Sequence, residues 1–378
     1  MSTRSHKCCP AVQPAERDKQ DFSHGEGLTE LQGMELREVA DFDQMLSRMA
    51  RTSFQGRNLG KAAEVLELMF SEPDNLVVLT ISGALTVAQQ GPIFVDLIRA
   101  GLVQVVVGTG ALLTHDVLEN LGFAHYEAPA IPDAEAAEKG LCRVYDSIEL
   151  ETSFDAFDKF LKGKLELLMP AMNGGEAEGS AGFCRRLGLL LLEHYPEQRS
   201  ILSAAAEADV PVYIPAFTDS EMALDVFNRM VHRNRGQAHP LDTVILPPFN
   251  QFMDLLEYTR LVESHRNGQL CIFTLGGGAP RNWAQQVAPT LDVMKLDGLE
   301  VHAPRFSRGV RICPDPPHWG HLSGCTYSEG VSWAKFAAPN EGGRFAEVLA
   351  DATLVLPLLV KGVLQRLEKR GWKQPRPT

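Results

Sequence analysis

Short apolar runs alternate along the chain with longer segments of helical periodicity. Each run is rich in β-branched residues and leads into a turn that carries glycine, threonine or aspartate. Four such runs are residues 76–80, 103–107, 210–214 and 270–275. Continuous apolar strands that alternate with helices are typical of a parallel sheet covered on both faces. The pattern therefore predicts a doubly wound α/β fold with a mostly parallel sheet and helices on both faces.

Helix boundary signals follow the first two predicted strands. Pro92 stands early in the segment after the first strand, and Gly101 ends that segment. After the second strand, we expect Thr114 to cap a helix around residues 116–120.

The four turns that follow these strands predict a ligand site. Ligands of parallel sheets bind beyond the carboxyl ends of the strands, and all four turns would lie on that rim. Glycine turns let backbone N–H groups approach phosphate closely, so a dinucleotide is the natural candidate. Gly108-Thr109-Gly110 lacks the third glycine of the usual fingerprint and is, alone, more typical of a tight turn. The triplet 276–278 is more informative, because three glycines are costly in chain entropy unless a backbone passes close to something.

The length of 378 residues suits one large domain or two ordinary ones. We interpret residues 28–370 as a single catalytic domain, with a flexible N-terminal tail over 1–27 and a C-terminal tail over 371–378. Residues 1–27 are polar and lack the apolar core of a signal peptide, and no window reaches the roughly 18 apolar residues of a membrane span. We therefore expect a cytoplasmic protein with no membrane partner.

Charge and cysteine usage exclude some partners. The net charge of −12 argues against nucleic acid, and it suits a cationic substrate, although many proteins are this acidic for solubility alone. The seven cysteines show no pair with metal-ligand spacing, so we expect reduced thiols. A metal site built from His115, His318 and His321 is disfavoured, because no carboxylate or cysteine shares their spacing. No metal is predicted.

The most informative segment is residues 320–335, GHLSGCTYSEGVSWAK. Its one lysine, Lys335, follows Trp333 in a mainly apolar context, with Glu329 six residues before it. A catalytic amine must be unprotonated to attack a carbonyl or imine, and burial beside an aromatic ring lowers its pKa. Glu329 would oppose that shift but could bind a substrate ammonium group. Spacing alone favours the commoner alternative, a lysine on an amphipathic helix with its ammonium group in water.

Six segments in order along the chain resemble the deoxyhypusine synthase family. The segment VSWAK at 331–335 is similar to the family's imine-forming lysine motif. The similarity extends over roughly residues 40–365. The other matching segments are FQGRNLG at 54–60, the two NAD-contacting turns within 79–116, Thr218-Asp219, the glycine triplet at 276–278, and ADATLV at 350–355.

The resemblance implies a Rossmann-like fold, NAD as cofactor and a polyamine as substrate. Family members oxidise spermidine, expel 1,3-diaminopropane and hold the aminobutyl fragment as an imine on the lysine that matches Lys335. The acceptor is a protein lysine of a translation factor in deoxyhypusine synthases and putrescine in homospermidine synthases. The family assembles as a homotetramer with active sites at a dimer interface.

The resemblance also suggests roles for individual residues. Trp333 would form an apolar wall that can hold a cation by its ring face, and Glu329 would pair with a substrate ammonium group. Asp219 and Asp351 match cofactor positions where a carboxylate accepts hydrogen bonds from ribose hydroxyls. The remaining expected cofactor contacts are Gly83, Ala84, Thr109, Gly110, Ala111, Gly277 and Ala352.

Several departures from the family pattern fall in the substrate half of the site. Asn282 replaces the family's histidine after the glycine triplet, and an asparagine cannot act as a base. His318 and His321 are new in the loop before the lysine motif, and either could supply the base or be an exposed loop residue. Thr114 and His115 stand near an expected acid, and Leu224 stands for an expected aspartate, with Glu221 and Asp225 as candidate substitutes. Trp319 and Leu322 stand for two loop acids.

These changes resemble the deoxyhypusine synthase-like branch, where a Leu-Ser-Gly turn and an asparagine after the triplet occur together. The leading hypothesis is an NAD-dependent transferase of aminobutyl or similar groups, with Lys335, Glu329, Trp333, Asn282 and His321 as catalytic residues. The alternative is a non-catalytic NAD- or polyamine-binding protein that kept the fold. A hydrolase on a related NAD fold lacks support, because the zinc cysteine pairs are absent.

Overall fold

The computed structural model describes residues 27–170, 176–233 and 249–373. The predicted tails lie mostly outside these residues. The chain folds around a six-stranded sheet whose neighbouring strands all pair in parallel, in the order β6-β2-β1-β7-β8-β9. The fold prediction is confirmed. The strands of this sheet are β1 Leu76–Ile81, β2 Val105–Gly108, β6 Val212–Tyr213, β7 Leu270–Leu275, β8 Arg308–Ile312 and β9 Arg344–Val348.

The strand order explains the alternation read from the sequence. The chain starts in the middle of the sheet at β1, builds outward through β2 to β6, and then returns to β7 on the other side of β1. The direction of winding therefore reverses between β1 and β7. In an open parallel sheet this reversal leaves a crevice beyond the carboxyl ends of the two strands.

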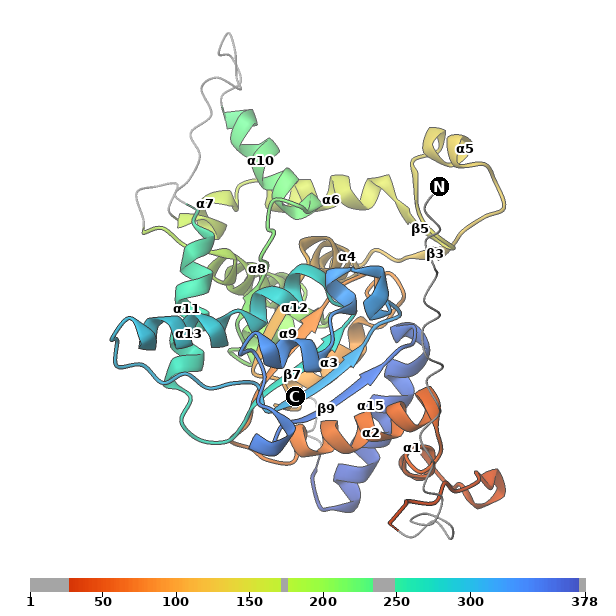
Figure 1. The fold of residues 1–378 in the computed structure, drawn as a ribbon. Helices are drawn as coiled ribbons and strands as arrows, with labels where there is room; N and C mark the ends of the chain where they lie inside the picture. The colour runs from red at the N-terminus through yellow and green to blue at the C-terminus, as the bar shows by residue number, and fades with distance from the viewer. Residues whose placement is uncertain (1–26, 171–175, 234–248, 374–378) are drawn as a thin grey trace, which may run out of the picture.

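Two hydrophobic cores lie on the two faces of the sheet. Every residue of β1 is buried, and its side chains alternate between the faces. Val77, Leu79 and Ile81 belong to the larger core, which helices α1, α2, α3, α4, α8, α9 and α15 cover, whereas Leu76 and Val78 belong to the smaller core beneath α11, α12 and α13. Figure 1 shows the helices packed around the central strands. The sequence of β1 is apolar throughout because both of its faces are covered.

The helices that cover the sheet are mostly short. The boundaries predicted for the helix after β1 are confirmed: α3 has Pro92 in its first turn and ends at Arg99, before Gly101. The helices are α1 Phe42–Met49, α2 Phe54–Phe70, α3 Gly91–Arg99, α4 Gly110–Asn120, α5 Asp133–Glu138, α6 Glu151–Leu161, α7 Leu165–Leu168, α8 Ser180–His194, α9 Ile201–Glu207, α10 Glu221–Arg233, α11 Gln251–Ser264, α12 Gly278–Gln285, α13 Val287–Leu296, α14 Tyr327–Ser332 and α15 Ala352–Lys369. Short 3₁₀ turns lie at Leu36–Glu38 (η1), Pro317–Trp319 (η3), Leu322–Gly324 (η4) and Pro339–Glu341 (η5).

The predicted cap of the helix after β2 is wrong. Helix α4 begins at Gly110, directly after the strand, and its N-cap is Thr109, whose hydroxyl accepts a hydrogen bond from the Leu112 N–H at 3.4 Å. Thr114 is buried inside the helix, where its hydroxyl donates to the Gly110 carbonyl at 3.0 Å. The helix starts early because β2 ends as soon as the chain reaches the rim of the sheet.

A small lobe projects from the body between α4 and α6 (Figure 1). It consists of α5 and an antiparallel three-stranded sheet in the order β3-β5-β4, formed by β3 Tyr126–Glu127, β4 Leu141–Val144 and β5 Ser147–Leu150. The turn between β4 and β5 carries Tyr145, which is largely exposed and adopts a positive φ of 56°.

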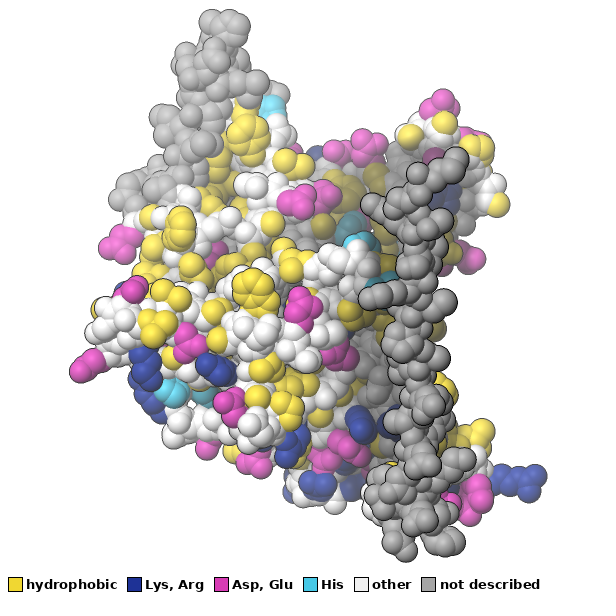
Figure 2. All heavy atoms as spheres, viewed as in Figure 1, with side chains coloured by type: hydrophobic (Ala, Val, Ile, Leu, Met, Phe, Trp, Pro, Cys, Tyr) yellow, Lys and Arg dark blue, Asp and Glu magenta, His cyan; other side chains and the backbone are white. Residues whose placement is uncertain are grey.

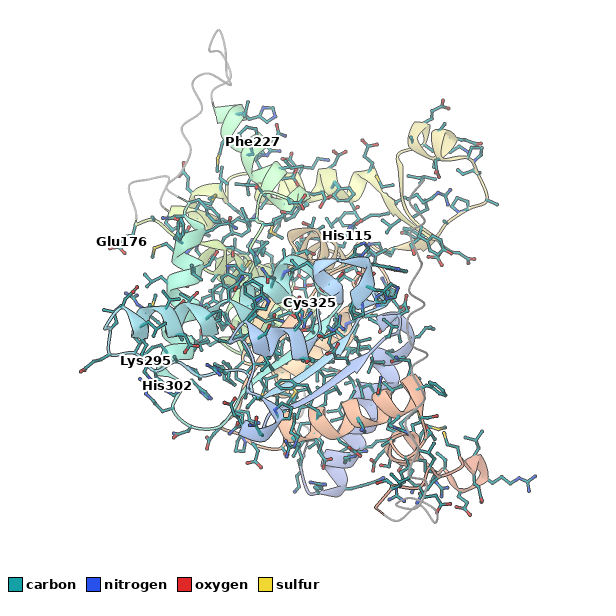
Figure 3. The ribbon with its side chains drawn as sticks, viewed as in Figure 1. His115, Glu176, Phe227, Lys295, His302 and Cys325 are labelled. Atoms are coloured by element: carbon teal, nitrogen blue, oxygen red, sulfur yellow. The ribbon has the colours of Figure 1, made fainter. Side chains whose placement is uncertain are left out.

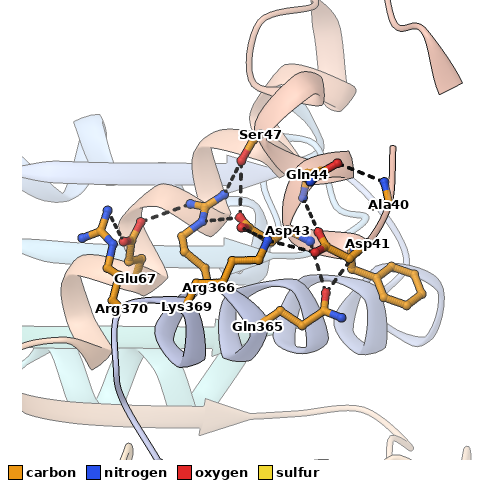
Figure 4. Close-up of polar contacts among 11 residues, drawn as sticks. Ala40, Asp41, Asp43, Gln44, Ser47, Glu67, Gln365, Arg366, Lys369 and Arg370 are labelled. Atoms are coloured by element: carbon orange, nitrogen blue, oxygen red, sulfur yellow. Dashed lines mark hydrogen bonds and ion pairs between the residues drawn. The ribbon is translucent and has the colours of Figure 1, made fainter. Parts of the chain in front are cut away.

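An ionic network fastens the two ends of the domain together (Figure 4). The Arg366 guanidinium of α15 lies 2.7 Å from Asp43 of α1 and 3.2 Å from Glu67 of α2. Lys369 adds a contact of 2.8 Å to Asp43. Burial opposes ionisation of Asp43, but hydrogen bonds from Lys369 and Arg366 outweigh burial and lower its pKa. The network holds α15, whose first turn reaches the rim of the crevice, against the N-terminal helices.

Candidate active site

A crevice of ≈ 970 Å³ opens at the carboxyl ends of the strands, at the reversal between β1 and β7. Such a position is where open α/β sheets bind their ligands. The turns after β1, β2, β7, β8 and β9 all contribute to its wall, together with the β4–β5 turn of the small lobe. The main lining segments are residues 82–85, 87–89, 109, 144–147, 276–280, 313–315, 323 and 351–353.

The glycine triplet brings three turns into contact at this rim. The Gly277 N–H donates to Ser82 Oγ at 2.9 Å, which joins the turns after β7 and β1. A Cβ added at Gly277 would lie 2.6 Å from Ser323 Cα, within the η4 turn. Glycine is therefore required at 277 by a close approach of two backbones, as the sequence argument for the triplet anticipated.

Six of the nine predicted cofactor residues line the crevice, and the other three do not. The lining residues are Gly83, Ala84, Thr109, Gly277, Asp351 and Ala352. Gly110, Ala111 and Asp219 are absent from the lining. A Cβ at Gly110 would lie 2.3 Å from Ser220 Cβ, so this glycine lets α4 pack against the turn that carries Asp219. Asp351 accepts a hydrogen bond from the Thr353 N–H at 2.7 Å and caps α15 at the edge of the crevice.

A second cavity of ≈ 340 Å³, which we call the lysine pocket, adjoins the turns of the crevice. It brings together four of the five predicted catalytic residues, from segments more than 40 residues apart in the sequence. Helix α12 borders both cavities: its residues Gly278–Pro280 line the crevice, and its residues Arg281, Asn282 and Gln285 line the pocket. The pocket is lined by Arg281, Asn282, Gln285, Gln286, Pro289, Leu322, Cys325, Glu329, Trp333 and Lys335.

Lys335 points its amine into this pocket. Helix α14 ends at Ser332, and Ala334 takes a positive φ of 56° that turns the chain before Phe336 pairs with Phe306 in an isolated bridge. The Lys335 side chain is thereby held at 9 % exposure, and its Nζ donates to Asn282 Oδ1 at 3.1 Å. Burial lowers the pKa of Lys335, which favours the neutral amine that a nucleophile requires.

Arg281 is a site residue that sequence reasoning missed. It is 2 % exposed, its Nη1 donates to the Cys325 carbonyl at 2.6 Å, and its guanidinium carbon lies 5.3 Å from the centroid of the Tyr327 ring. Its Nε and Nη2 have no hydrogen-bond partner among the described residues. The positive charge of Arg281 adds to burial in lowering the pKa of Lys335, whereas Cys325 and Glu329 oppose the shift. An arginine beside Asn282 gave no signal in the sequence, because its role depends on the α14 segment.

Of the other three predicted catalytic residues, two line the lysine pocket and one does not. Glu329 and Trp333 line the lysine pocket, with Trp333 66 % exposed at its mouth. His321 does not line either cavity; its Nδ1 lies 3.6 Å from Asp315 Oδ2 on the exposed loop. His318 packs its ring edge-on against Trp319 on the same loop. The role of His321 as a base stays a prediction.

The substitute acids considered for Leu224 lie away from both cavities. Asp225 is on α10, where burial and the neighbouring Glu221 and Asp155 raise its pKa to about 6. Neither Asp225 nor Glu221 lines the crevice or the lysine pocket.

The family model named deoxyhypusine synthase matches residues 44–363. The chain belongs to the deoxyhypusine synthase family. Lys335 and the lining turns of both cavities therefore lie within the matched region of a deoxyhypusine synthase family member.

Curated relatives agree over nearly the whole chain. The chain is 31 % identical to probable deoxyhypusine synthase 2 of Methanosarcina mazei, across 88 % of this chain and 89 % of that protein. It is 30 % identical to a deoxyhypusine synthase-like protein of Chlorobaculum tepidum, across 87 % of each. A solved structure from Entamoeba histolytica, provisionally named a deoxyhypusine synthase, has a TM-score of 0.52 at 14 % identity and covers 89 % of this chain and 97 % of that one. The structural likeness supports the fold alone.

A membrane span is absent from the described part of the chain, since none of its helices combines the length and apolarity needed to cross a bilayer.

Proposed function

We propose that this family member is an NAD-dependent transferase that moves an aminobutyl or similar aminoalkyl group between amines. The observation that carries the proposal is the Lys335 amine, which is buried, hydrogen-bonded to Asn282 and lowered in pKa beside a glycine-rimmed crevice. A non-catalytic lysine gains nothing from burial, because desolvation of an ammonium group is unfavourable. Family membership supplies the reaction class.

The crevice fits a dinucleotide. Its volume lies at the upper end of the roughly 300–1,000 Å³ range of small-molecule sites. Gly83 and Gly278 have positive φ angles, and a Cβ at either residue would meet no protein atom within 4 Å. These open glycines leave room for phosphate groups, and the Asp351 carboxylate would face a ribose. When bound, NAD would supply the acceptor and later the donor of a hydride.

Lys335 would act as the covalent carrier. Oxidation of the donor amine makes its carbon an imine carbon, and the Lys335 lone pair adds to that carbon. The leaving amine departs with a proton, and the fragment stays bound to Nζ as an imine. The acceptor amine then displaces Lys335 by the same exchange, and return of the hydride reduces the new imine. The sequence of steps has no net redox change.

Two lining residues would hold the substrate, and a third would hold Lys335. Glu329 pairs with a substrate ammonium group, and the Trp333 ring covers an alkyl chain at the mouth of the pocket. Asn282 holds the Lys335 amine in place through its side-chain oxygen. The donor is therefore a polyamine such as spermidine. The acceptor is either a small diamine or a protein lysine. As in the family, the subunits would form a homotetramer with sites at a dimer interface.

The second candidate is a binding protein that kept the fold and lost turnover. It is favoured by Asn282, which cannot accept a proton as the family's histidine could, and by the position of His321 outside the lysine pocket. Such a protein would bind NAD and polyamine without forming a covalent adduct.

A trapping experiment separates the two candidates. The purified protein is incubated with NAD and spermidine, treated with borohydride and analysed by intact and peptide mass spectrometry. We expect an aminobutyl adduct on the peptide that contains Lys335. The adduct should be absent in Lys335→Ala and present in Lys361→Ala, which removes an exposed lysine of α15. NAD binding without any adduct from spermidine, putrescine or agmatine would establish the binding protein instead.

The acceptor is identified in the same system. The enzyme is incubated with NAD and spermidine and then offered putrescine or a lysine-bearing peptide before borohydride is added. The amine whose addition removes the adduct from Lys335 is the acceptor. Size-exclusion chromatography with light scattering checks the tetramer.

A further inference from the structure

Three side chains that can bind metal converge beneath the small lobe. His115 lies on α4, His125 on the segment that leads from α4 to β3, and Glu149 on β5. One nitrogen of each histidine and one oxygen of Glu149 all lie within 4.8 Å of one another. Figure 3 labels His115 on the side of the body that faces the lobe, and Figure 2 shows histidine atoms at the surface in that region.

The separations of these atoms approach those of a zinc site. His125 Nε2 lies 3.4 Å from Glu149 Oε2 and 3.5 Å from His115 Nδ1. Ligand atoms about 2.0–2.1 Å from a tetrahedral zinc ion lie roughly 3.3–3.4 Å apart. The third separation, His115 Nδ1 to Glu149 Oε2, is 2.5 Å and would open by about 0.8 Å to admit the ion.

An outer shell orients two of the three ligands. His125 Nδ1 lies 2.8 Å from Glu119 Oε1, which directs its Nε2 toward the cluster. Ser153 Oγ donates to Glu149 Oε1 at 3.2 Å and leaves Oε2 facing the histidines. Gln89 in turn donates to Glu119. Metal-binding histidines commonly have a carboxylate on their second nitrogen, and this partner fixes both tautomer and ring orientation.

Burial and charge make this a place for a cation. The Glu149 side chain is 2 % exposed and that of His125 3 %. His115 Nδ1 and His125 Nε2 both face the Oε2 atom of this buried carboxylate. A buried carboxylate needs a positive partner, which is either a proton shared with the imidazoles or a metal ion.

We propose that His115, His125 and Glu149 bind a zinc ion that ties the small lobe to α4. Two imidazoles and a carboxylate are a ligand set that suits zinc, with the fourth position open to water. The turn before Glu149, residues 144–147, forms part of the crevice wall. The ion therefore fixes that wall against α4, whose N-cap, Thr109, also lines the crevice. The proposal does not depend on the transferase function.

The sequence alone predicts no metal site, because the residues of this cluster are far apart along the chain. In the sequence His115 can be grouped with His318 and His321, and no carboxylate or cysteine shares their spacing. In the described structure His115 instead meets Glu149, 34 residues away, because β5 returns beside α4.

Metal binding to the full-length protein tests the proposal directly. The protein is stripped with a chelator and titrated with Zn²⁺ by calorimetry, and then loaded with Co²⁺ for visible spectroscopy. We expect one tight equivalent of Zn²⁺, intense ligand-field bands of four-coordinate Co²⁺, and a rise in Tm of about 3 °C at a hundredfold excess over Kd. The His318→Asn/His321→Asn double variant should retain the site, because its exposed histidines are not ligands.

Variants of the cluster decide between a metal and a proton. Glu149→Gln and His125→Gln should weaken Zn²⁺ binding more than 100-fold. Glu119→Gln keeps all three ligands and should weaken binding about 10- to 100-fold through the outer shell. Circular dichroism checks that each variant is folded. Weak Zn²⁺ binding by the wild type, unchanged in Glu119→Gln and Glu149→Gln, would show that only protons occupy the cluster and would overturn the proposal.

Discussion

At the scale of single residues, the lysine pocket combines a buried amine with a buried guanidinium. Two positive groups in one small space are unfavourable for stability, but each makes the other easier to deprotonate. Because an arginine keeps its proton in proteins, the lysine is the group that becomes easier to deprotonate. Arg281 is therefore a positioning residue for the reactivity of Lys335, acting through its charge.

Neutralising Arg281 should raise the pKa of Lys335. In Arg281→Gln, the contribution of burial remains but the repulsion between charges is lost, so less of the amine is neutral at a given pH. We expect the midpoint of the pH profile for acylation of Lys335, followed by peptide mass spectrometry, to move to higher pH. Arg281→Lys retains the charge and serves as the matched control. An identical midpoint in all three proteins would contradict this role.

Asp225 gives a second prediction at this scale. Its pKa is raised to about 6 in the folded protein by burial and by Glu221 and Asp155, so folding favours its protonated form. The associated stability is fully present below the ordinary aspartate pKa and is lost as pH rises through about 6. Asp225→Asn should therefore be more stable than wild type by about 1 kcal/mol at pH 8, after allowance for solvent screening, and nearly equal at about pH 3.5, below the ordinary aspartate pKa. Urea unfolding at the two pH values measures the difference.

At the scale of elements, the site depends on turns that touch one another. Gly277 has an extended φ of 166°, which any residue can adopt, so only its distance from Ser323 demands glycine. Gly278 is the reverse case, with a positive φ of 63° and open space where a Cβ would lie. Glycine is therefore needed at 277 because of a steric contact and at 278 because of the backbone conformation.

Alanine at these two positions should therefore have different effects. Gly277→Ala pushes the η4 turn away from the crevice and should weaken NAD binding at least tenfold, as measured by calorimetry. Gly278→Ala should cost about 1 kcal/mol of stability through the left-handed backbone and change NAD affinity less. Equal losses of affinity in both variants would show that contact with Ser323 is unimportant.

The elements differ in how well the sequence predicted them. Strands β1 and β7 were predicted within one residue because both faces of each are buried and their sequences are apolar throughout. Strands β8 and β9 were not singled out, since Arg308, Arg311 and Glu347 interrupt their apolar pattern. The small lobe escaped prediction because its strands are short and partly exposed, and their pairing depends on contacts distant in sequence.

The candidate site was predictable where motifs carried it. Resemblance to the family brought out Lys335, Glu329, Trp333 and Asn282, and the structure places all four around one pocket. Gly110 was predicted as a cofactor residue from its turn sequence, but glycine is needed there because a Cβ would clash with Ser220. Such close approaches between segments far apart in sequence leave no local pattern.

At the scale of the whole molecule, the first two α-helices and the last one meet on one face of the sheet. Helix α15 packs against α1 and α2, and the Arg366 network joins all three helices (Figure 4). The first turn of α15 also carries Asp351, Ala352 and Thr353 to the crevice. Anchoring of the C-terminal helix is therefore part of the construction of the site.

Two arginines of α15 should differ in their value to stability. Arg366→Ala leaves the buried carboxylates of Asp43 and Glu67 short of a partner and should lower the free energy of unfolding by about 3 kcal/mol. Arg370→Ala removes a 66 % exposed side chain that contacts Glu67 from the solvent side, while Arg366 still pairs with Glu67, and it should cost less than about 1 kcal/mol. Urea unfolding of both variants provides the comparison, and equal costs would show that the network is dispensable.

Helix α12 is a wall shared by the two cavities: three of its residues line the crevice and three others line the lysine pocket. A displacement of this helix that narrows the crevice also changes the shape of the lysine pocket. Occupancy of the crevice and acylation or alkylation of the lysine therefore cannot be tuned independently. Whatever free energy a ligand in the crevice contributes to the equilibrium attachment of a group to Lys335, that attached group must contribute equally to the affinity for the ligand.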